Sequence, residues 1–472
     1  MKILLVRPPD PLQHVALLSH TKPINLAYIA AYLLQKGFSV KIIDYEIEQF
    51  FKEAFFQMLK DYKPAVLAVS CMTPTIKNGA AICDLTKEFD TSIKTVVGGV
   101  HANGLPIRTL EEFSSFDYLV YGEGEITFHE LCLCLRERGD VSDIAGVVYR
   151  DNGEIIKNPP RELIEDLDIF PFPARHLINF DTQAGHSSRG FSNKIRSAEI
   201  FTSRGCPIGC TFCGIQATFG RRMRFRKPSF IAAEVQECVE KYNCNHIVIA
   251  DDTFTLKRER AFEICDILAM SGVKSWTCDT RVNTVSEELL RVMKKSGCQK
   301  VAFGVESGSQ RIIDLIGKKI EIEQVRNAVH LAKKIGIRHI EGNFIIGSDP
   351  SETLADVALS KQLITSLPWT LVSVTVVVPY PGSPLYTTMQ EKKLLYVEDW
   401  EDFVMFGKSP KWRTEKFSSE DLVALQKELI KAFYLRPKYI IQQILGVRSL
   451  VDIYYWIVAG KAYLKWYLTG KV

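Results

Sequence analysis

Three cysteines lie close together in the segment RGCPIGCTFC, with three residues between Cys206 and Cys210 and two between Cys210 and Cys213. A disulfide uses two thiols and a structural zinc site usually has four ligands, so three is an unusual number. Three thiolates in one tight loop suit a cubane iron–sulfur cluster with one iron left open. An open iron is useful only if a substrate or cofactor binds there, which indicates catalysis.

Zinc is the main alternative for this cluster, and it would need a fourth ligand nearby. The next cysteine, Cys238, falls within a predicted amphipathic helix, and His186 precedes the strand that leads into the loop. The usual second C-x-x-C pair of a zinc knuckle is absent. We therefore favour iron–sulfur over zinc.

Composition and compartment agree with reduced thiols. The chain has 472 residues, of which 46% are hydrophobic and 24% charged, which is typical of a globular protein of two or three domains. The opening run stops at Pro8, too early for a signal peptide, and no apolar run is long enough to span a membrane. We expect a cytoplasmic protein whose other cysteines are buried apolar residues. The net charge of +4 gives no argument for nucleic acid, and we expect no such partner.

Residues 1–160 alternate short β-rich runs with amphipathic helical stretches, which predicts a Rossmann-like domain with a doubly wound parallel sheet. Its expected strands are 1–6, 40–43, 65–69, 95–97 and 118–121, followed by a hairpin that turns at Asn152-Gly153. Residues 161–195 are expected to form a linker, because four prolines fall between Pro159 and Pro173.

A second alternation occupies residues 196–390. The expected strands are 198–202, 246–250, 275–280, 301–305, 339–346 and 371–378. Six βα units predict an open, partial (β/α)6 barrel, since a closed eight-unit barrel needs about 250 residues. The three cysteines follow the first of these strands, at the carboxyl mouth where barrel enzymes place their chemistry.

The cysteine segment resembles the C-x-x-x-C-x-x-C motif of the radical S-adenosylmethionine superfamily, with an aromatic residue, Phe212, before the last cysteine. The resemblance implies a [4Fe-4S] cluster on Cys206, Cys210 and Cys213. It further implies that the open iron chelates S-adenosylmethionine, whose reduction yields a 5′-deoxyadenosyl radical, and that Phe212 lies near the adenine.

Other positions match this superfamily more loosely. Asp251 and Asp252 follow the second barrel strand, where the family places the group that receives the methionine ammonium, often as Gly-Gly-Glu. The resemblance leaves open which aspartate makes the contact. Arg281, Glu306 and Ser307 occupy positions that usually meet the carboxylate and the ribose. Plain ion pairs at the barrel rim are an equal alternative for these residues.

The basic run GRRMRFRK (220–227) follows the cysteine loop. We expect a solvated face, with Arg224 or Arg226 steering an anionic group as the alternative.

The N-terminal domain has neither G-x-G-x-x-G after its first strand nor a P-loop, which argues against nicotinamide, flavin and nucleoside triphosphate sites. Its strand ends resemble cobalamin-binding domains, in the group that lacks the D-x-H-x-x-G histidine. The resemblance implies a corrinoid site made of seven residues: Ser70, Thr73, Gly98, Gly99, His101, Gly122 and Glu123. Taken singly, the two adjacent glycines also fit a tight turn, and the histidine fits an ordinary loop position.

The C-terminal region, 391–472, is expected to be helical, with a helix start at Ser418-Ser419-Glu420-Asp421. Its last 36 residues, 437–472, are rich in aromatic, aliphatic and basic side chains. Packing against the barrel is the first interpretation. The second is peripheral membrane contact, which would favour a lipid, isoprenoid or tetrapyrrole substrate.

Together these resemblances imply a cobalamin-dependent radical S-adenosylmethionine enzyme, with methyl transfer to an unactivated carbon of a small-molecule or lipid-like substrate as the leading activity. Oxidative cyclisation or rearrangement without methyl transfer is the alternative, and a corrinoid-binding sensor is a second one. An electron donor such as flavodoxin or ferredoxin is the expected protein partner.

Overall fold

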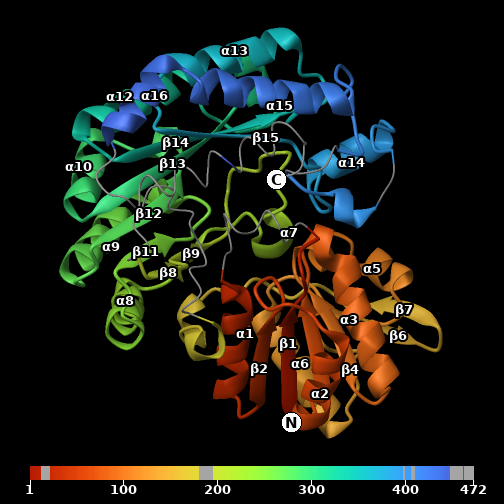
Figure 1. Cartoon of the computed structure of the whole chain (residues 1–472). Helices are drawn as coiled ribbons and strands as arrows, with labels where there is room; N and C mark the ends of the chain where they lie inside the picture. The colour runs from red at the N-terminus through yellow and green to blue at the C-terminus, as the bar shows by residue number, and fades with distance from the viewer. Residues whose placement is uncertain (12–21, 180–194, 397–398, 406–409, 447–460, 462–472) are drawn as a thin grey trace.

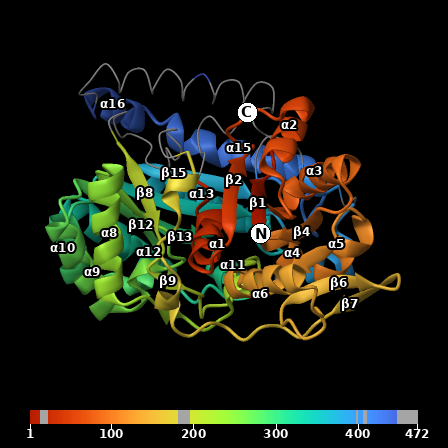
Figure 2. The ribbon, with the colours of Figure 1, turned by 90° about the horizontal axis from the view of Figure 1, so that it is seen from below.

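The computed structural model describes residues 1–11, 22–179, 195–396, 399–405, 410–446 and 461, and it folds into two α/β halves (Figure 1). Each half is built on its own parallel sheet, and a short antiparallel ribbon lies between them. The barrel lies above the N-terminal half in Figure 1, and Figure 2, seen from below, shows barrel helices α8, α9 and α10 on one flank and α2, α3 and α5 on the other.

The N-terminal half contains a seven-stranded sheet in the order β2-β1-β3-β4-β5-β6-β7. The first five strands are parallel, and the last two form an antiparallel hairpin at the edge. This confirms the predicted doubly wound domain. The strands are β1 Lys2–Arg7, β2 Ser39–Asp44, β3 Val66–Ser70, β4 Lys94–Gly98, β5 Tyr118–Val120, β6 Val147–Asp151 and β7 Glu154–Lys157.

Helices cover both faces of this sheet, so the central strands are apolar on both sides. Ile3, Leu4, Leu5 and Val6 of β1 are almost completely buried. Helix α1 packs beside α6, and α2 beside α3. The helices are α1 Ile24–Gln35, α2 Lys52–Tyr62, α3 Ile76–Phe89, α4 Val100–Gly104, α5 Pro106–Glu112 and α6 Gly124–Glu137.

The second half is a six-stranded parallel sheet in the order β15-β14-β13-β12-β11-β8, which confirms the predicted open barrel. The strands are β8 Ser197–Ile200, β11 His246–Ile249, β12 Ser275–Thr280, β13 Cys298–Glu306, β14 His339–Ile346 and β15 Leu371–Val376. The helices are α8 Pro228–Tyr242, α9 Arg258–Met270, α10 Glu287–Lys295, α11 Gln310–Leu315, α12 Ile322–Ile335, α13 Leu354–Ser366 and α14 Pro384–Glu391.

Successive side chains of each barrel strand face the helices and the interior in turn. Along β14, Ile340, Phe344 and Ile346 are buried, whereas Glu341 and Asn343 between them are partly accessible. The interior of the barrel is therefore lined in part by polar residues.

The C-terminal region packs against the edge of the barrel through α15 Ser419–Tyr434, followed by α16 Pro437–Gly446 (Figure 1). Ser418 caps α15 in a capping box with Asp421, as the sequence predicts. The Tyr434 hydroxyl donates to the Val372 carbonyl (2.8 Å), and Gln426 donates to the Val374 carbonyl (3.0 Å). Because β15 is an edge strand, these bonds satisfy carbonyls that have no neighbouring strand.

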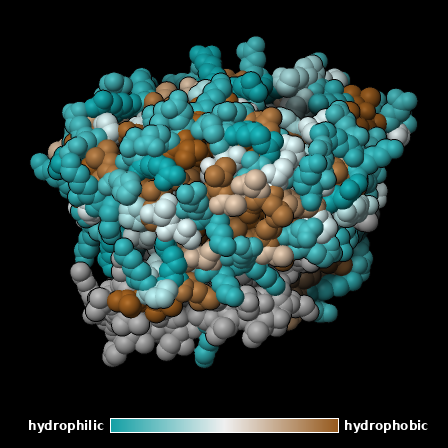
Figure 3. All heavy atoms as spheres, turned by 90° about the horizontal axis from the view of Figure 1, so that it is seen from above, coloured by the Kyte–Doolittle hydropathy of each residue, from teal (hydrophilic) through white to brown (hydrophobic). Residues whose placement is uncertain are grey.

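The structure does not test the predicted membrane contact. Most of segment 437–472 lies outside the described residues. Within the described part of the chain, no helix has both the length and the apolarity to cross a bilayer. Hydrophilic and hydrophobic residues alternate in small patches on the face over the barrel helices (Figure 3).

The described part of the expected linker, 161–179, packs into the core of the molecule. It carries η3 Leu167–Ile169 and η4 Arg175–Leu177, and Leu167, Phe170 and Arg175 are buried. The Arg175 guanidinium pairs with Glu234 of α8 at 2.5 Å, and the Ala174 N–H donates to the Ala27 carbonyl of α1. The segment thus joins the two halves by direct contacts.

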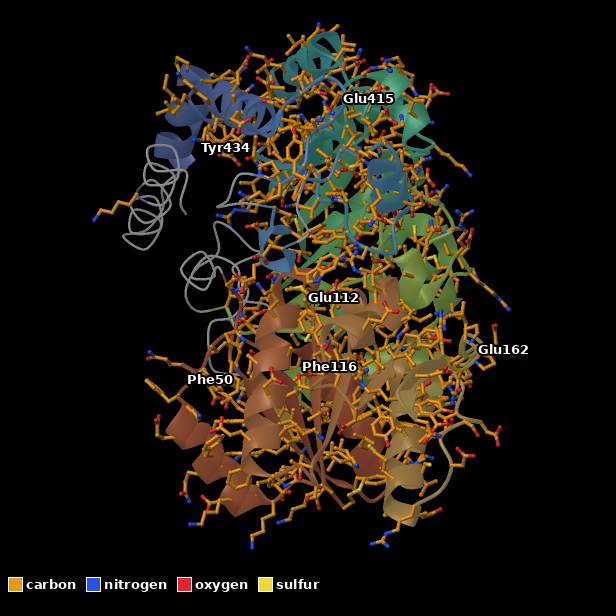
Figure 4. All side chains as sticks on the ribbon, turned by 90° about the vertical axis from the view of Figure 1, so that its right-hand side faces the viewer. Phe50, Glu112, Phe116, Glu162, Glu415 and Tyr434 are labelled. Carbon is orange, nitrogen blue, oxygen red and sulfur yellow. The ribbon has the colours of Figure 1, made fainter. Side chains whose placement is uncertain are left out.

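Further contacts hold the two halves together beside α4. The Asn103 side chain donates to Thr218 at 2.6 Å, and Gly104 lies against the backbone of Pro381. On the same flank, the Trp400 indole donates to Glu112 at 2.6 Å, and Figure 4 shows Glu112 at the junction of the halves. The halves are thus fixed in one orientation by contacts from several elements.

Gly104→Ala tests this packing. A Cβ at Gly104 would lie 2.5 Å from the Pro381 carbonyl oxygen, a backbone atom that cannot rotate away. We expect Gly104→Ala to destabilise the chain by about 1–3 kcal/mol, visible as a lower melting temperature. Gly124→Ala is the control, because its Cβ would meet nothing closer than the Ile29 side chain at 3.7 Å. Equal melting of the two variants would contradict the tight contact.

Candidate active site

The cysteine loop begins directly after β8 and is closed at its base by an antiparallel ribbon, β9 Ser203–Arg204 with β10 Arg224–Phe225. Helix α7, Gln216–Phe219, follows the last cysteine. The Thr211 N–H donates to the Ile316 carbonyl (3.0 Å), and the Leu385 N–H donates to the Thr211 carbonyl (2.8 Å). The loop is thus anchored to the end of α11 and the start of α14.

All three cysteines are free thiols; Cys210 is buried, while Cys206 and Cys213 are partly accessible. Burial raises the pKa of Cys210, and the positive charges of Lys318 and Arg281 oppose this effect. Cationic side chains close to the thiols favour the thiolates that an iron–sulfur cluster requires. Within the described residues, no three Cys, His, Asp or Glu side chains are arranged around a single metal ion. His186, which the sequence analysis considers as a fourth zinc ligand, lies outside the described residues.

Arg281 and Glu306 both lie beside the cysteine loop. Arg281 directly follows β12, and Glu306 is the last residue of β13. The Arg281 guanidinium donates to the Lys318 and Lys319 carbonyls, and its charge acts on Cys206 and Cys210. Glu306 accepts from the Lys318 ammonium at 2.5 Å.

The backbone of Glu306 has a φ of 71°, a conformation that is uncommon outside glycine. Ser307 is completely buried, and its hydroxyl lies 3.3 Å from that of Ser360 on α13. Ser307 thus links the end of β13 to α13, and its burial argues against direct contact with a ribose. Phe212, in contrast, is partly accessible within the cysteine loop.

The two adjacent aspartates after β11 have different environments. Asp251 is buried and accepts hydrogen bonds from the N–H groups and hydroxyls of Thr202 and Ser203. Its oxygens are already used to join the ends of β8 and β11. Asp252 is accessible, and in the described part of the chain no hydrogen bond or ion pair reaches its carboxylate. Burial, together with the charge of Asp251, raises the pKa of Asp252 to about 6.

The carboxyl end of the N-terminal sheet faces the barrel, as the cobalamin resemblance requires. Of the seven candidates, Ser70, Gly98, Gly99 and Gly122 are partly exposed there. Gly99 has a φ of 99°, and a Cβ on it would lie 2.6 Å from the Cys71 carbonyl oxygen. A close approach within the protein therefore explains this glycine. Met72, which the sequence did not single out, is 44% exposed at the same edge.

The other three candidates are occupied by protein contacts. Thr73 is 2% exposed and His101 is fully buried, with its ring 4.8 Å from that of Trp400. Burial lowers the pKa of His101 to about 3. Glu123 is buried between Arg204 and Arg224. These placements argue against direct corrinoid contact by these three side chains.

A buried ion network joins the cysteine loop to the N-terminal half. Arg204, two residues before Cys206, pairs with Glu123 (2.9 Å) and Glu125 (2.5 Å), and Arg224 pairs with Glu123 (2.6 Å). The expected solvated face of run 220–227 is correct for Arg221, Arg222 and Lys227, which are exposed, and wrong for Arg224 and Arg226, which are buried. The sequence alone could not predict these ion pairs, because the arginines and glutamates are about 80 to 100 residues apart.

A cavity of about 700 Å³ lies between the two halves. Arg7, Ser70 and Met72 line it from the N-terminal sheet, and Asp252 and Asp279 line it from the barrel. The carboxyl ends of both sheets therefore open into one space, which is where cofactors of both domains would meet.

Comparison with known proteins identifies both halves. Residues 15–132 match the B12 binding domain and residues 200–361 match the radical SAM superfamily. An uncharacterized methyltransferase of Pyrococcus horikoshii is 32% identical over 466 residues, covering 96% of this chain and 99% of that protein. The chain belongs to the cobalamin-binding radical S-adenosylmethionine enzymes.

More distant relatives of this radical enzyme have different activities. Cytidylyl-2-hydroxyethylphosphonate methyltransferase of Streptomyces wedmorensis is 29% identical, with coverage of 74% and 73% of the two chains. Anaerobic magnesium-protoporphyrin IX monomethyl ester cyclase of Rubrivivax gelatinosus is 26% identical, with coverage of 83% and 70%. The fold resembles the structure of the cobalamin-dependent radical enzyme OxsB with aqua-cobalamin bound, at a TM-score of 0.73, 17% identity, and coverage of 98% and 71%.

Arg204→Met tests the buried network of this enzyme. Removing the guanidinium leaves Glu123 and Glu125 buried with less or no compensation, which we expect to cost about 3–5 kcal/mol of stability. Arg222→Met is the matched control, because its ion pair with Glu165 (2.6 Å) is exposed and is worth at most about 1 kcal/mol. Thermal melting and iron content per chain measure both variants.

The pH dependence gives an independent check on Arg204. Burial alone would raise the pKa of Glu125, but Arg204 outweighs it, so the folded pKa is lowered. The pair therefore stabilises the fold above the ordinary carboxyl pKa and loses this contribution as the pH falls. Arg204→Met should melt with a shallower dependence on acid pH than the unmodified chain. An unchanged acid profile would contradict the network.

Proposed function

We propose that this enzyme methylates an unactivated carbon of a small molecule held in the cavity between its two halves. The main support for this proposal is that the carboxyl edge of the cobalamin domain and the interior of the radical barrel line the same cavity. When bound, the cluster and S-adenosylmethionine supply a hydrogen-abstracting radical, and cobalamin supplies the methyl group. A cofactor pair of this kind needs such a shared space.

The balance of this reaction fixes its products. Two molecules of S-adenosylmethionine and two electrons are consumed for each methylated substrate. One S-adenosylmethionine loses its methyl group and becomes S-adenosylhomocysteine. The other yields methionine and 5′-deoxyadenosine, which carries the hydrogen removed from the substrate. We propose a flavodoxin or ferredoxin as the electron donor.

Roles for the residues follow from their environments. Cys206, Cys210 and Cys213 would hold the cluster, with Lys318 and Arg281 compensating its charge. Phe212 would lie against the adenine, and Glu306 would contact the ribose. Ser70, Gly98 and Gly122 would face the corrinoid.

Oxidative cyclisation without methyl transfer is the second candidate, because magnesium-protoporphyrin cyclases match most of the chain. It differs in its products, since no S-adenosylhomocysteine accompanies it.

Labelled S-adenosylmethionine separates these reactions. The full chain is reconstituted without oxygen with iron, sulfide and hydroxocobalamin, reduced, and given S-adenosylmethionine with a deuterated methyl group and a metabolite extract. We expect 5′-deoxyadenosine, S-adenosylhomocysteine and a deuteromethylated product, with the last two dependent on cobalamin. Substrate turnover without S-adenosylhomocysteine would favour cyclisation. An intact cluster that never cleaves S-adenosylmethionine would favour a sensor.

A second prediction separates the two aspartates. Asp252, accessible and unpaired in the described residues, is the one we assign to the methionine ammonium. Asp252→Asn should weaken S-adenosylmethionine binding about 10- to 100-fold, the worth of one charge-assisted hydrogen bond, with little change in melting temperature. Asp251→Asn should instead destabilise the fold by about 1–3 kcal/mol, because an amide donor would face the Thr202 and Ser203 donors.

Equilibrium binding at several pH values completes this test. Because the pKa of Asp252 is raised to about 6, affinity for S-adenosylmethionine should fall as the pH drops below that value. Asp252→Asn should lack this fall. If Asp251→Asn weakens binding more than Asp252→Asn in protein of equal stability, the assignment is reversed.

A further inference from the structure

The interior of the barrel carries charged side chains on the strands that lead up to its mouth. Glu199 of β8, Asp279 of β12 and Lys300 of β13 all line the cavity, and Lys22 enters it from the N-terminal half. Glu341 of β14 faces the same interior and pairs with Lys300 at 3.1 Å. Charges inside a barrel are costly to bury without partners, so their pairing is informative.

Strand register places Asp279 among these groups. Thr277 pairs with Lys300, and two residues further Asp279 pairs with Ala302, which in turn pairs with Glu341. Asp279 and Glu341 therefore flank β13 at the same level of the barrel, with Lys300 one level below. Arg281, beside the cysteines, comes two residues after Asp279, just past the end of β12.

Most of the charges around the cavity have protein partners. Arg7 pairs with Glu46 and lies 3.6 Å from Asp44. Lys22 donates to the Ser197 carbonyl at 2.7 Å, and its charge opposes the burial of Glu199.

On the barrel side of the cavity, Asp279 is an exception among the described residues. No hydrogen bond or ion pair reaches its carboxylate, although it is open to the cavity. The charge of Lys300 acts on it at a distance, but the Lys300 ammonium is bonded to Glu341. Two other carboxylates of the cavity, Asp252 and Glu199, also lack an ion pair in the described part of the chain. Asp252 is assigned above to the cofactor, and the charge of Lys22 acts on Glu199 from the N-terminal half. Asp279 is therefore left for a group that the protein does not supply.

We propose that the substrate of this enzyme is a polar molecule with a cationic nitrogen, which binds Asp279 in the barrel interior. The inference rests on the proposed function and adds the substrate class. An ammonium, guanidinium or protonated ring nitrogen is the group that compensates an isolated carboxylate, and hydrogen bonds between the two are strengthened by charge. Asp279 would thus be a specificity-determining residue, two residues before Arg281.

A cavity with these charged side chains should bind hydrocarbon substrates poorly. A lipid or isoprenoid chain in this interior would remove water from Asp279 and Lys300 and give nothing in return. The polar lining thus disfavours the lipid-like substrates that the aromatic C-terminal segment suggests.

A panel of defined probes tests the proposal without knowledge of the natural substrate. The panel consists of amines, guanidines and protonated heterocycles, each with a neutral isostere, such as L-arginine with L-citrulline and putrescine with 1,4-butanediol. The reconstituted full chain with S-adenosylmethionine is screened by thermal shift, and binding constants are measured by calorimetry. We expect at least one cation to bind ten times or more tightly than its neutral isostere.

Asp279→Asn connects this selectivity to the residue. It should reduce the affinity for the cation tenfold or more, to that of the neutral isostere, and leave the neutral one unchanged. Because the carboxylate has no partner to lose, the variant should melt at the same temperature as the unmodified chain or higher. Asp266→Asn is the matched control, since Asp266 is exposed on α9 outside the cavity.

Two outcomes overturn the proposal. One is a panel in which no cation is preferred over its isostere. The other is a preference that survives Asp279→Asn. If 5′-deoxyadenosine and S-adenosylhomocysteine still form in the labelling experiment, only the substrate class is wrong. If neither forms, the proposed function itself fails.

Discussion

The site depends on one buried interaction, the pairing of Arg204 with Glu123 and Glu125. Arg204 ends the strand that leads into the cysteine loop, and the two glutamates begin α6 of the N-terminal half. Burying these charges is unfavourable unless both halves are in place, because the glutamates and the arginines that compensate them, Arg204 and Arg224, come from different halves. The position of the cysteine loop is thus fixed relative to the cobalamin domain rather than by the barrel alone.

That constraint explains why the cavity lies where it does. Both sheets present their carboxyl ends to it, and parallel sheets collect loops and polar side chains at those ends. The buried segment around Arg175 and the contacts beside Gly104 hold the two halves together around it. Polar side chains in the barrel then determine which molecules can enter.

The fold was predictable because buried parallel strands are short apolar runs, and β12 and β14 begin and end at the predicted residues. The cysteine trio was predictable because its three ligands are neighbours in sequence. Lys318 and Asp279 were not singled out, since their significance comes from residues brought close only by folding. The same holds for Asp251 and Asp252, which adjacent sequence positions cannot separate. One side chain bonds the end of β8 while the other faces the cavity.

The central claim is that the cluster and the cobalamin share one space between the halves. Electron paramagnetic resonance tests it directly, because both the reduced cluster and cob(II)alamin carry unpaired electrons. In protein loaded with both, the account predicts spin–spin interaction, seen as broadened cob(II)alamin lines and faster relaxation than in protein without the cluster. Cob(II)alamin signals that are identical with and without the reduced cluster would contradict it.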